Sequence, residues 1–304
     1  MPHPSLYIGL DAGGTKTELL AQVSEHAPPV SLIGPAGNLQ RQGREATAEV
    51  LATLVRQALA QQPGATLEAV CAGVAGAGNA ADQQALAASL QRLLHNLGPF
   101  RLQITHDGTI ALEAAFEGGS GVMIIAGTGS ILFGRTHDGN TVRAGGWGYL
   151  LGDEGSGHAL GLHGLRAVAH AYDGGPPTRL QILLATRHGL DTPGALVHSV
   201  YREAWPVQQM ARLVLEAAED GDDIARRIVR EQTQALARQA AWLAERSGPI
   251  APRLALLGGL SRSTYYKQAL SEALLTALPG WRIEKPLHPP VVGALRLAMA
   301  TATP

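Results

Sequence analysis

Cysteine, charge and long apolar runs are all scarce in this chain of 304 residues. The single cysteine, Cys71, excludes a disulfide within one chain and leaves no cluster for a cysteine-based zinc or iron–sulfur site. A small buried apolar residue is the simplest interpretation of Cys71. No apolar run approaches the ~20 residues that cross a bilayer, and MPHPSLYIGL at the start lacks the basic and apolar regions of a signal peptide. We therefore expect a cytoplasmic protein with no membrane partner.

Charged side chains make up only 16% of the residues, and the formal net charge is -1. This balance gives no electrostatic reason to expect nucleic acid as a partner, because such binding usually calls for a basic patch. The arginines of DDIARRIVR at 222–230 are explained more simply as a solvated helix face. Hydrophobic residues, by contrast, reach 45%, which is enough for two domains with substantial cores.

Strand-like and helix-like segments alternate through the first part of the chain. An opening hairpin, YIGLDAGGTKTELLAQV, occupies residues 7–23. In chain order it is followed by a helix at 44–62, a buried strand that opens LEAVCAGVAGAG at 67–78, a helix through Leu86 and Leu97, and a strand at 101–107. This succession predicts an α/β fold with crossover connections.

A second hairpin of the same design, GVMIIAGTGSILFGR, begins at residue 121. Helical patterns follow, notably at 222–248, then a buried strand with RLALLGGLSRS and a short amphipathic segment, VVGALRLAMA, at 291–300. Because each half opens with the same hairpin, we expect an internally duplicated architecture. No long linker separates the halves, so we expect them to meet across a cleft.

The tip of the first hairpin has the composition of a phosphate-binding turn. Gly13 and Gly14 allow backbone N–H groups to approach a phosphate closely. Asp11 is a hard oxygen ligand suited to Mg²⁺ or to its bound water. Further donors come from three consecutive side chains, Thr15, Lys16 and Thr17.

The turn lacks Walker A spacing and joins two strands, so a plain tight turn is the alternative. The second tip, AGTGS at 126–130, favours the phosphate interpretation, since two such turns could hold one polyphosphate from opposite walls.

Several motifs together resemble a known superfamily. They are IGLDAGGTKTE at 8–18, HDG at 106–108, IAGTGS at 125–130, GGWGYLLGDEGSG at 145–157 and LALLGGLSRS at 254–263. Their order and spacing are similar to those of the sugar kinase/Hsp70/actin superfamily. Within it the chain resembles the N-acetylglucosamine kinase and BadF/BadG/BcrA/BcrD ATPase-type group, over nearly its whole length.

The resemblance implies a two-domain, internally duplicated actin-like ATPase fold of the ribonuclease H-like type. The N-terminal domain would comprise 1–115, joined by a C-terminal helix at 291–304, and the second domain would comprise 116–290. The resemblance also implies ATP and Mg²⁺ as cofactors and a homodimer as the assembly.

In this family pattern, 11–17 forms the first phosphate motif and Gly127, Thr128 and Gly129 form the second. Gly258 and Gly259 fall in the adenosine motif. Asp107 takes the position of the catalytic base, which accepts the proton of the attacking sugar hydroxyl. Independently of the family, a carboxylate at a strand end suits catalysis in an α/β sheet; the alternative is an aspartate that caps a helix beginning near Ile110. His106 replaces the more usual asparagine, and it either orients Asp107 or fills space.

The resemblance implies sugar contacts at Asn38, Asp107, Gly145, Gly146, Trp147 and Asp153. Asn38 and Asp153 offer the donors and acceptors that hydroxyl groups need. Trp147 would pack on a sugar face or an acetyl methyl group, with a core tryptophan as the alternative. Because Asp153 and Glu154 are adjacent, only one points into the site, and we favour Asp153. GVAGAG at 73–78 would line the sugar side of the cleft.

The implied activity is an ATP-dependent kinase acting on the 6-hydroxyl of N-acetylglucosamine or glucosamine. An acetyl group calls for an apolar niche and a free amine for a nearby carboxylate, and the sequence leaves this choice open. The alternative is an ATP-hydrolysing activator of a partner protein, but such activators hold an iron–sulfur cluster with two cysteines from each subunit, and this chain has one. His158, His163 and His170 lack the i, i+4 spacing of a zinc pair.

Overall fold

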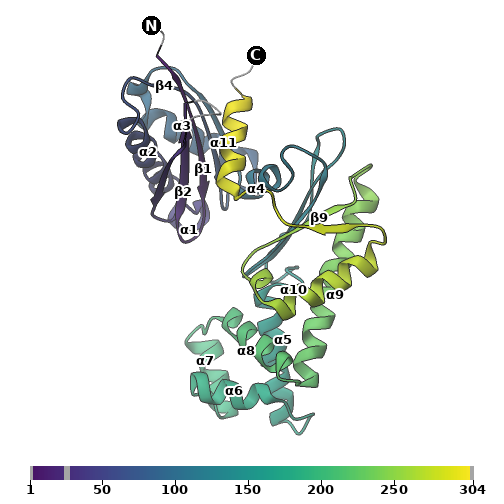
Figure 1. Cartoon of the computed structure of the whole chain (residues 1–304). Helices are drawn as coiled ribbons and strands as arrows, with labels where there is room; N and C mark the ends of the chain where they lie inside the picture. The colour runs from purple at the N-terminus through teal and green to yellow at the C-terminus, as the bar shows by residue number, and fades with distance from the viewer. Residues whose placement is uncertain (1–2, 24–27, 302–304) are drawn as a thin grey trace. The chain divides into compact units, whose positions relative to one another are not determined.

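The computed structural model describes residues 3–23 and 28–301, and the chain divides into two compact units (Figure 1). The first unit takes in the chain up to Gly119 together with the stretch from Pro286 onward, and the second comprises Ser120–Lys285. Each unit has its own sheet and its own apolar core. That these units act as the two expected ATPase domains stays a prediction.

The sheet of the first unit has the strand order β3-β2-β1-β4-β5. Its strands are β1 (Ser5–Ala12), β2 (Thr17–Gln22), β3 (Val30–Gly34), β4 (Thr66–Val74) and β5 (Arg101–His106). The first three pair antiparallel, as expected for the opening hairpin, whereas β1, β4 and β5 run parallel. The carboxyl ends of β1, β4 and β5 therefore share one edge of the sheet.

Helices cover both faces of this sheet (Figure 1). They are α1 (Leu39–Gln42), α2 (Arg44–Ala60), α3 (Ala80–Leu93), the 3₁₀ turn η1 (His95–Leu97), α4 (Asp107–Phe116) and α11 (Pro290–Ala300). Strand alternation sends Ile8 into the core with α2 and α3, while Cys71 packs with α4 and α11. Gly9 lets α11 approach, because a Cβ there would lie 2.2 Å from the backbone nitrogen of Leu295.

The second unit repeats the same topology. Its strands are β6 (Gly121–Ala126), β7 (Ser130–Arg135), β8 (Thr141–Gly145), β9 (Arg253–Leu257) and β10 (Arg282–Glu284). Read from the opposite edge, the order β8-β7-β6-β9-β10 matches that of the first unit, including the antiparallel hairpin and the two parallel pairs. The α/β class and the internal duplication are thus confirmed, and the repeated five-stranded sheet is the core of the actin-like ATPase fold.

The second unit carries more helices than the first. They are α5 (Gly157–Tyr172), α6 (Arg179–His188), α7 (Pro193–Arg202), η2 (Val207–Gln209), α8 (Met210–Glu219), α9 (Asp223–Arg246), η3 (Leu260–Arg262) and α10 (Thr264–Ala277). Tyr266 anchors α10, since its ring is fully buried and its hydroxyl donates to the Gly155 carbonyl at 2.5 Å. Within the described part of the chain, no helix has the length and apolarity to span a membrane.

Candidate functional site

The first candidate turn lies where β1 and β2 meet. The Gly13 N–H donates to the Lys16 carbonyl at 3.0 Å and closes the tip, as expected for a hairpin. Gly14, Thr15 and Lys16 are exposed. Their backbone and side-chain donors are therefore available to a ligand.

Two side chains that the motif predicts to be phosphate donors, those of Lys16 and Thr17, are not freely exposed donors. The Lys16 ammonium already forms an ion pair with the Glu18 carboxylate. The Thr17 hydroxyl is fully buried without a partner, 2.8 Å from where a Cβ on Gly37 would stand. Thr17 shares the inward face of β2 with Leu19 and Ala21, so its hydroxyl is not among the donors of the exposed tip.

Asp11 lies on β1 within electrostatic reach of Asp107. Burial, followed by the negative charges of Asp107 and Glu18, raises the pKa of Asp11 to about 7. A divalent cation bound between these two carboxylates would relieve their repulsion. No group of three or more His, Cys, Asp or Glu suited to a metal occurs among the described residues. Mg²⁺ in kinases, however, needs only one or two carboxylates besides phosphates.

Asp107 is the first residue of α4 rather than the last residue of a strand. His106 is the N-cap residue, so the alternative that Asp107 caps a helix beginning near Ile110 is wrong. The Gly108 N–H lies 2.9 Å from both His106 Nδ1 and Asp107 Oδ1. His106 Nδ1 also lies 2.8 Å from Asp107 Oδ1. Nδ1 either accepts the Gly108 N–H or, when it carries a proton, donates to this carboxylate.

Asn38 lies near the segment at 73–78, which comprises the end of β4 and the turn that follows it. Asn38 is the N-cap of α1, where its Oδ1 accepts the Arg41 N–H at 3.0 Å and its amide nitrogen stays free to donate. A Cβ on Gly76 would lie 3.4 Å from Asn38 Oδ1, and one on Gly78 would lie 3.9 Å from the His106 ring. The loop therefore brings Asn38 and His106 to the same edge of the sheet.

The second candidate turn joins β6 to β7 and contacts the start of α5 and the end of β9. The Gly157 N–H donates to the Gly127 carbonyl at 2.7 Å and the His158 N–H donates to the Thr128 carbonyl at 3.0 Å, which seats the turn on the start of α5. Gly258 follows β9 with φ +98°, and a Cβ there would lie 2.2 Å from the Ala126 carbonyl oxygen. The phosphate-type turn and the predicted adenosine motif thus lie side by side.

Asp153 packs directly against this turn. Its side chain is buried, with 8% exposure, and its Oδ1 accepts the Ser130 N–H at 3.3 Å. A Cβ on Gly129 would lie 2.8 Å from Asp153 Oδ2, which explains glycine at that position. The Glu154 carboxylate points elsewhere, because its Oε2 accepts the Gln239 amide at 2.5 Å. Of the two acids, Asp153 faces the turn and Glu154 does not; that Asp153 contacts a sugar stays a prediction.

Gly145, Gly146 and Trp147 lead from β8 toward Asp153. Both glycines have positive φ, and a Cβ on Gly146 would overlap the Ile131 side chain at 2.5 Å. Trp147 is 64% exposed, so the alternative of a core tryptophan is wrong. The Arg143 guanidinium stacks on its ring, 5.3 Å from the ring centre.

Two further residues belong with these sites although the motifs did not single them out. Arg41 is exposed, and its Nη1 lies 3.8 Å from where a Cβ on Gly14 would stand. Its guanidinium could therefore pair with an anion at the first turn. The ring of His158 lies 4.6 Å from that of Tyr149. Burial lowers the pKa of His158, although the negative charge of Asp153 acts in the opposite direction. No sequence spacing signals either contact.

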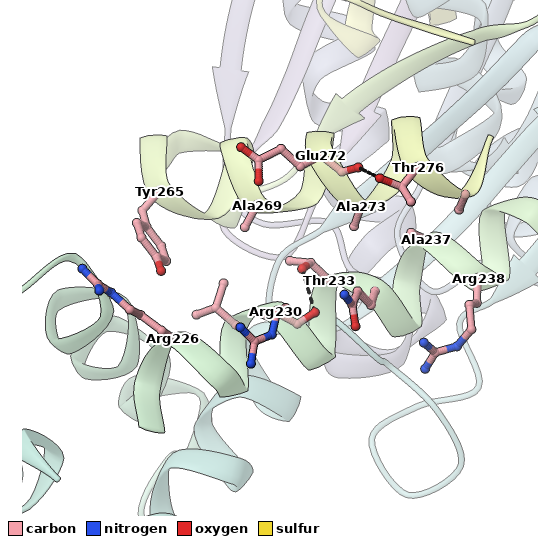
Figure 2. Close-up of a pocket in the computed structure, with 13 residues that line it drawn as sticks. Arg226, Arg230, Thr233, Ala237, Arg238, Tyr265, Ala269, Glu272, Ala273 and Thr276 are labelled. Atoms are coloured by element: carbon pink, nitrogen blue, oxygen red, sulfur yellow. Dashed lines mark hydrogen bonds between the residues drawn. The ribbon is translucent and has the colours of Figure 1, made fainter. Parts of the chain in front are cut away.

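A larger hollow lies away from all of these residues. It has a volume of about 560 Å³ and runs between α9 and α10 (Figure 2). Arg226, Arg230 and Arg238 of α9 and Tyr265 and Glu272 of α10 are among the residues that line it. Since no predicted site residue lines it, this groove stays outside the candidate site, and the exposed Arg226 and Arg230 agree with the expected solvated helix face.

Comparisons with known proteins agree with the motifs. The family model of the BadF/BadG/BcrA/BcrD ATPase family matches residues 8–298. An N-acetylmuramic acid/N-acetylglucosamine kinase from Clostridium acetobutylicum is 30% identical over 237 residues, which are 75% of this chain and 76% of that protein. An N-acetyl-D-glucosamine kinase from Dictyostelium discoideum is 28% identical, covering 97% and 98% of the two chains. The crystal structure of a Chromobacterium violaceum protein assigned as an N-acetylglucosamine kinase shares 27% identity at a TM-score of 0.74, over 98% and 100% of the two chains.

Proposed function

Because the chain belongs to the BadF/BadG/BcrA/BcrD ATPase family, we propose that it is an ATP-dependent kinase of an amino sugar, N-acetylglucosamine or glucosamine. The curated relatives with this kind of activity support the proposal over most of the chain. The observation that carries it is the placement of Asp107 at the N-terminus of α4, beside His106 and within electrostatic reach of Asp11.

Asp107 would act as the general base. As the 6-hydroxyl oxygen of the sugar attacks the γ-phosphorus, its proton passes to the Asp107 carboxylate and the bond from phosphorus to the ADP oxygen breaks. The Gly108 N–H, which donates to Asp107 Oδ1, would help to orient the carboxylate toward the sugar hydroxyl. His106 would hold the carboxylate in the orientation that accepts the proton.

Phosphate and nucleotide binding would use the two turns. Gly13, Gly14, Thr15 and Lys16 in the first unit, and Gly127, Thr128 and Gly129 in the second, would donate to phosphate oxygens. Gly258 and Gly259 would allow adenosine to approach the backbone. A bound Mg²⁺ would neutralise charge on the phosphates, with Asp11 as its protein ligand. Thr17 would support the first turn rather than touch the phosphates, since its hydroxyl is buried.

The sugar would be bound by Asn38 and Asp107 from the first unit and by Gly145, Gly146, Trp147 and Asp153 from the second. Asn38 would offer its amide N–H₂ group, because its oxygen caps α1. Exposed Trp147 would offer an aromatic face to the ring or to an acetyl methyl group. Asp153 would serve the sugar through the oxygen that is not bound to Ser130.

The position of transfer is tested on the reaction product. After incubation of the enzyme with Mg-ATP and N-acetylglucosamine, ³¹P–¹H correlation NMR is expected to couple the new phosphate to the two C6 protons. The 6-deoxy analogue serves as the matched control and should yield no phosphorylated sugar. A phosphate on O1, O3 or O4, or turnover of the analogue, would contradict the 6-hydroxyl assignment.

An ATP-hydrolysing activator is the alternative function. It would need cysteines at a surface to hold a cluster, but Cys71 is fully buried within β4. Burial also raises the pKa of this thiol to about 12. Both properties weigh against the activator.

A further inference from the structure

Asp153, a predicted sugar contact of the second unit, has an unusual backbone conformation. Its φ is +65°, in the left-handed region that residues other than glycine seldom adopt. The residue is also buried. Such a conformation persists only where the surrounding structure fixes it, and it occurs most often at functional sites. The groups that fix this backbone therefore bear on the reaction.

The loop that begins at Asp153 is closed by two hydrogen bonds of the β7 and α5 side of the site. The Ser156 N–H donates to the Asp153 carbonyl at 3.0 Å. The Ser130 hydroxyl, at the start of β7, donates to the Glu154 carbonyl at 2.8 Å. Neither bond involves Gly155, the residue in the middle of the loop. The hold on Gly155 must therefore come from other elements.

Two buried side chains from the helices behind the loop bind Gly155. Gln232 on α9 accepts the Gly155 N–H through its Oε1 at 3.2 Å, and the Tyr266 hydroxyl on α10 donates to the Gly155 carbonyl at 2.5 Å. Both side chains are buried, so water does not compete for either bond. The loop also lies closely against α9, because a Cβ on Gly155 would stand 2.8 Å from the Leu236 side chain. Both polar backbone groups of Gly155 are thus held by helices.

Core packing alone does not account for these two residue types. Leu236 and Leu270 belong to the same apolar core as Tyr266. A side-chain amide or hydroxyl buried in such a core costs free energy unless it is hydrogen-bonded. Leucine at 232 and phenylalanine at 266 would fill similar space without this cost. The polar atoms of Gln232 and Tyr266 therefore serve the loop to which they bind.

We propose that Gln232 and Tyr266 are positioning residues that act on the sugar through Asp153. By binding both polar backbone groups of Gly155, they keep Asp153 in its left-handed conformation. In that conformation Asp153 Oδ1 accepts the Ser130 N–H, and the second carboxylate oxygen is left for the sugar hydroxyls. This inference rests on the proposed kinase function and gives α9 and α10 a part in sugar binding.

The first test compares Tyr266→Phe with Tyr265→Phe. Tyr265 is the neighbouring residue on α10 but lines the groove between α9 and α10, so its variant is the matched control (Figure 2). ADP release gives the KM of each substrate, with Mg-ATP and whichever of N-acetylglucosamine and glucosamine the wild type phosphorylates. In Tyr266→Phe the KM of the sugar is expected to rise about tenfold, as for a misplaced substrate contact. The KM of ATP should stay within about twofold, and Tyr265→Phe should change neither value.

Replacements at Gln232 separate the hydrogen bond from packing. Gln232→Leu loses the acceptor for the Gly155 N–H, whereas Gln232→Glu keeps a side-chain oxygen that accepts in either protonation state. The KM of the sugar should rise in Gln232→Leu and recover in part in Gln232→Glu. Gln234→Leu is the control, because Gln234 is exposed and lines the groove instead. Equal sugar KM values in the two Gln232 variants would contradict the positioning role.

Hydrogen exchange of residues 153–157, followed by mass spectrometry, reports on the loop without any turnover. Exchange should be about tenfold faster in Tyr266→Phe than in the wild type, as for the loss of one buried hydrogen bond. An unchanged sugar KM in Tyr266→Phe, or an equal rise in Tyr265→Phe, would overturn the inference, while phosphorylation by the wild type still upheld the kinase. Faster exchange in the variant of a protein that phosphorylates no sugar would contradict the kinase function and uphold the hold on the loop.

Discussion

At the residue scale, the roles of the two carboxylates of the first unit can be separated. Asp107 is held by His106 and by the start of α4, whereas Asp11 is more deeply buried and its pKa is raised to about 7. A base must be held within reach of the substrate, and a metal ligand must gain from a cation nearby. These environments favour Asp107 as base and Asp11 as metal ligand.

Replacement of Asp107 by Asn is expected to lower kcat by about 10² to 10⁴, the range typical of a positioned base. ATP affinity, measured by calorimetry, should stay within about twofold, because the amide keeps the shape of the carboxylate. Asp138→Asn, at an exposed loop position, is the control and should retain activity. Near-wild-type turnover in Asp107→Asn would rule out the base assignment.

Asp11 should make stability depend on pH in metal-free buffer. Its pKa is about 7 in the folded chain against a usual 3.8, so between these values the folded state holds a proton that the unfolded state has lost. The free energy of unfolding should therefore fall as pH rises from about 4 to about 7. Asp11→Asn should remove this slope and add up to about 4 kcal/mol above pH 7. Equal slopes in denaturant titrations of both proteins would contradict this assignment.

The Cys71 thiol should not react in the native protein. It is fully buried in β4, and burial, followed by the charge of Glu113, raises its pKa to about 12. A thiol-specific reagent such as DTNB at pH 8 should therefore label the chain only after denaturation. Rapid labelling of the native protein would show that β4 opens or that the thiol is accessible.

At the element scale, the end of β9 depends on one glycine. Alanine at 258 would combine a φ of +98° with a Cβ 2.2 Å from the Ala126 carbonyl oxygen, a backbone atom that cannot swing away. We expect Gly258→Ala to lower the free energy of unfolding by about 3 kcal/mol or more. Gly259→Ala is the matched control, since nothing lies within 4 Å of its Cβ position. Equal thermal midpoints for the two variants would contradict the packing described here.

Regular elements were the most predictable part of this chain. The helix expected at 44–62 is α2, and the strands expected around both hairpin tips are present. The start of α4 was harder to predict from the sequence. Histidine is an unusual N-cap residue, and α4 begins at Asp107 directly after β5. The four-residue helix α1, which places Arg41 over Gly14, is too short to show any periodicity.

Site residues were harder to predict than elements, because orientation depends on packing. The burial of Thr17 could have been read from its parity with Leu19 and Ala21 on β2, but the motif suggested an exposed donor. Trp147 lies in a stretch as apolar as a core strand, yet Trp147, Leu150 and Leu151 are all exposed. The capping role of Asn38 could be anticipated only with the helix start known.

At the scale of the whole molecule, the same strand topology occurs in both units, and each unit places different functional residues on it. Each unit places a glycine-containing turn at the tip of its first hairpin and a parallel strand beside it. The first unit adds two carboxylates, and the second adds Asp153 and the glycines after β9. The predicted base and metal ligand thus belong to the first unit, and the second phosphate-type turn and the predicted adenosine motif belong to the second.

The most direct test of this account is a coupled ADP-release assay with Mg-ATP. The panel comprises glucose, glucosamine, N-acetylglucosamine, N-acetylmannosamine and N-acetylmuramic acid, with a control that contains no sugar. The account predicts strong stimulation by one or more amino sugars and little ADP release without sugar. ADP release of the same rate with every sugar and with none would contradict the kinase and favour the ATP-hydrolysing activator.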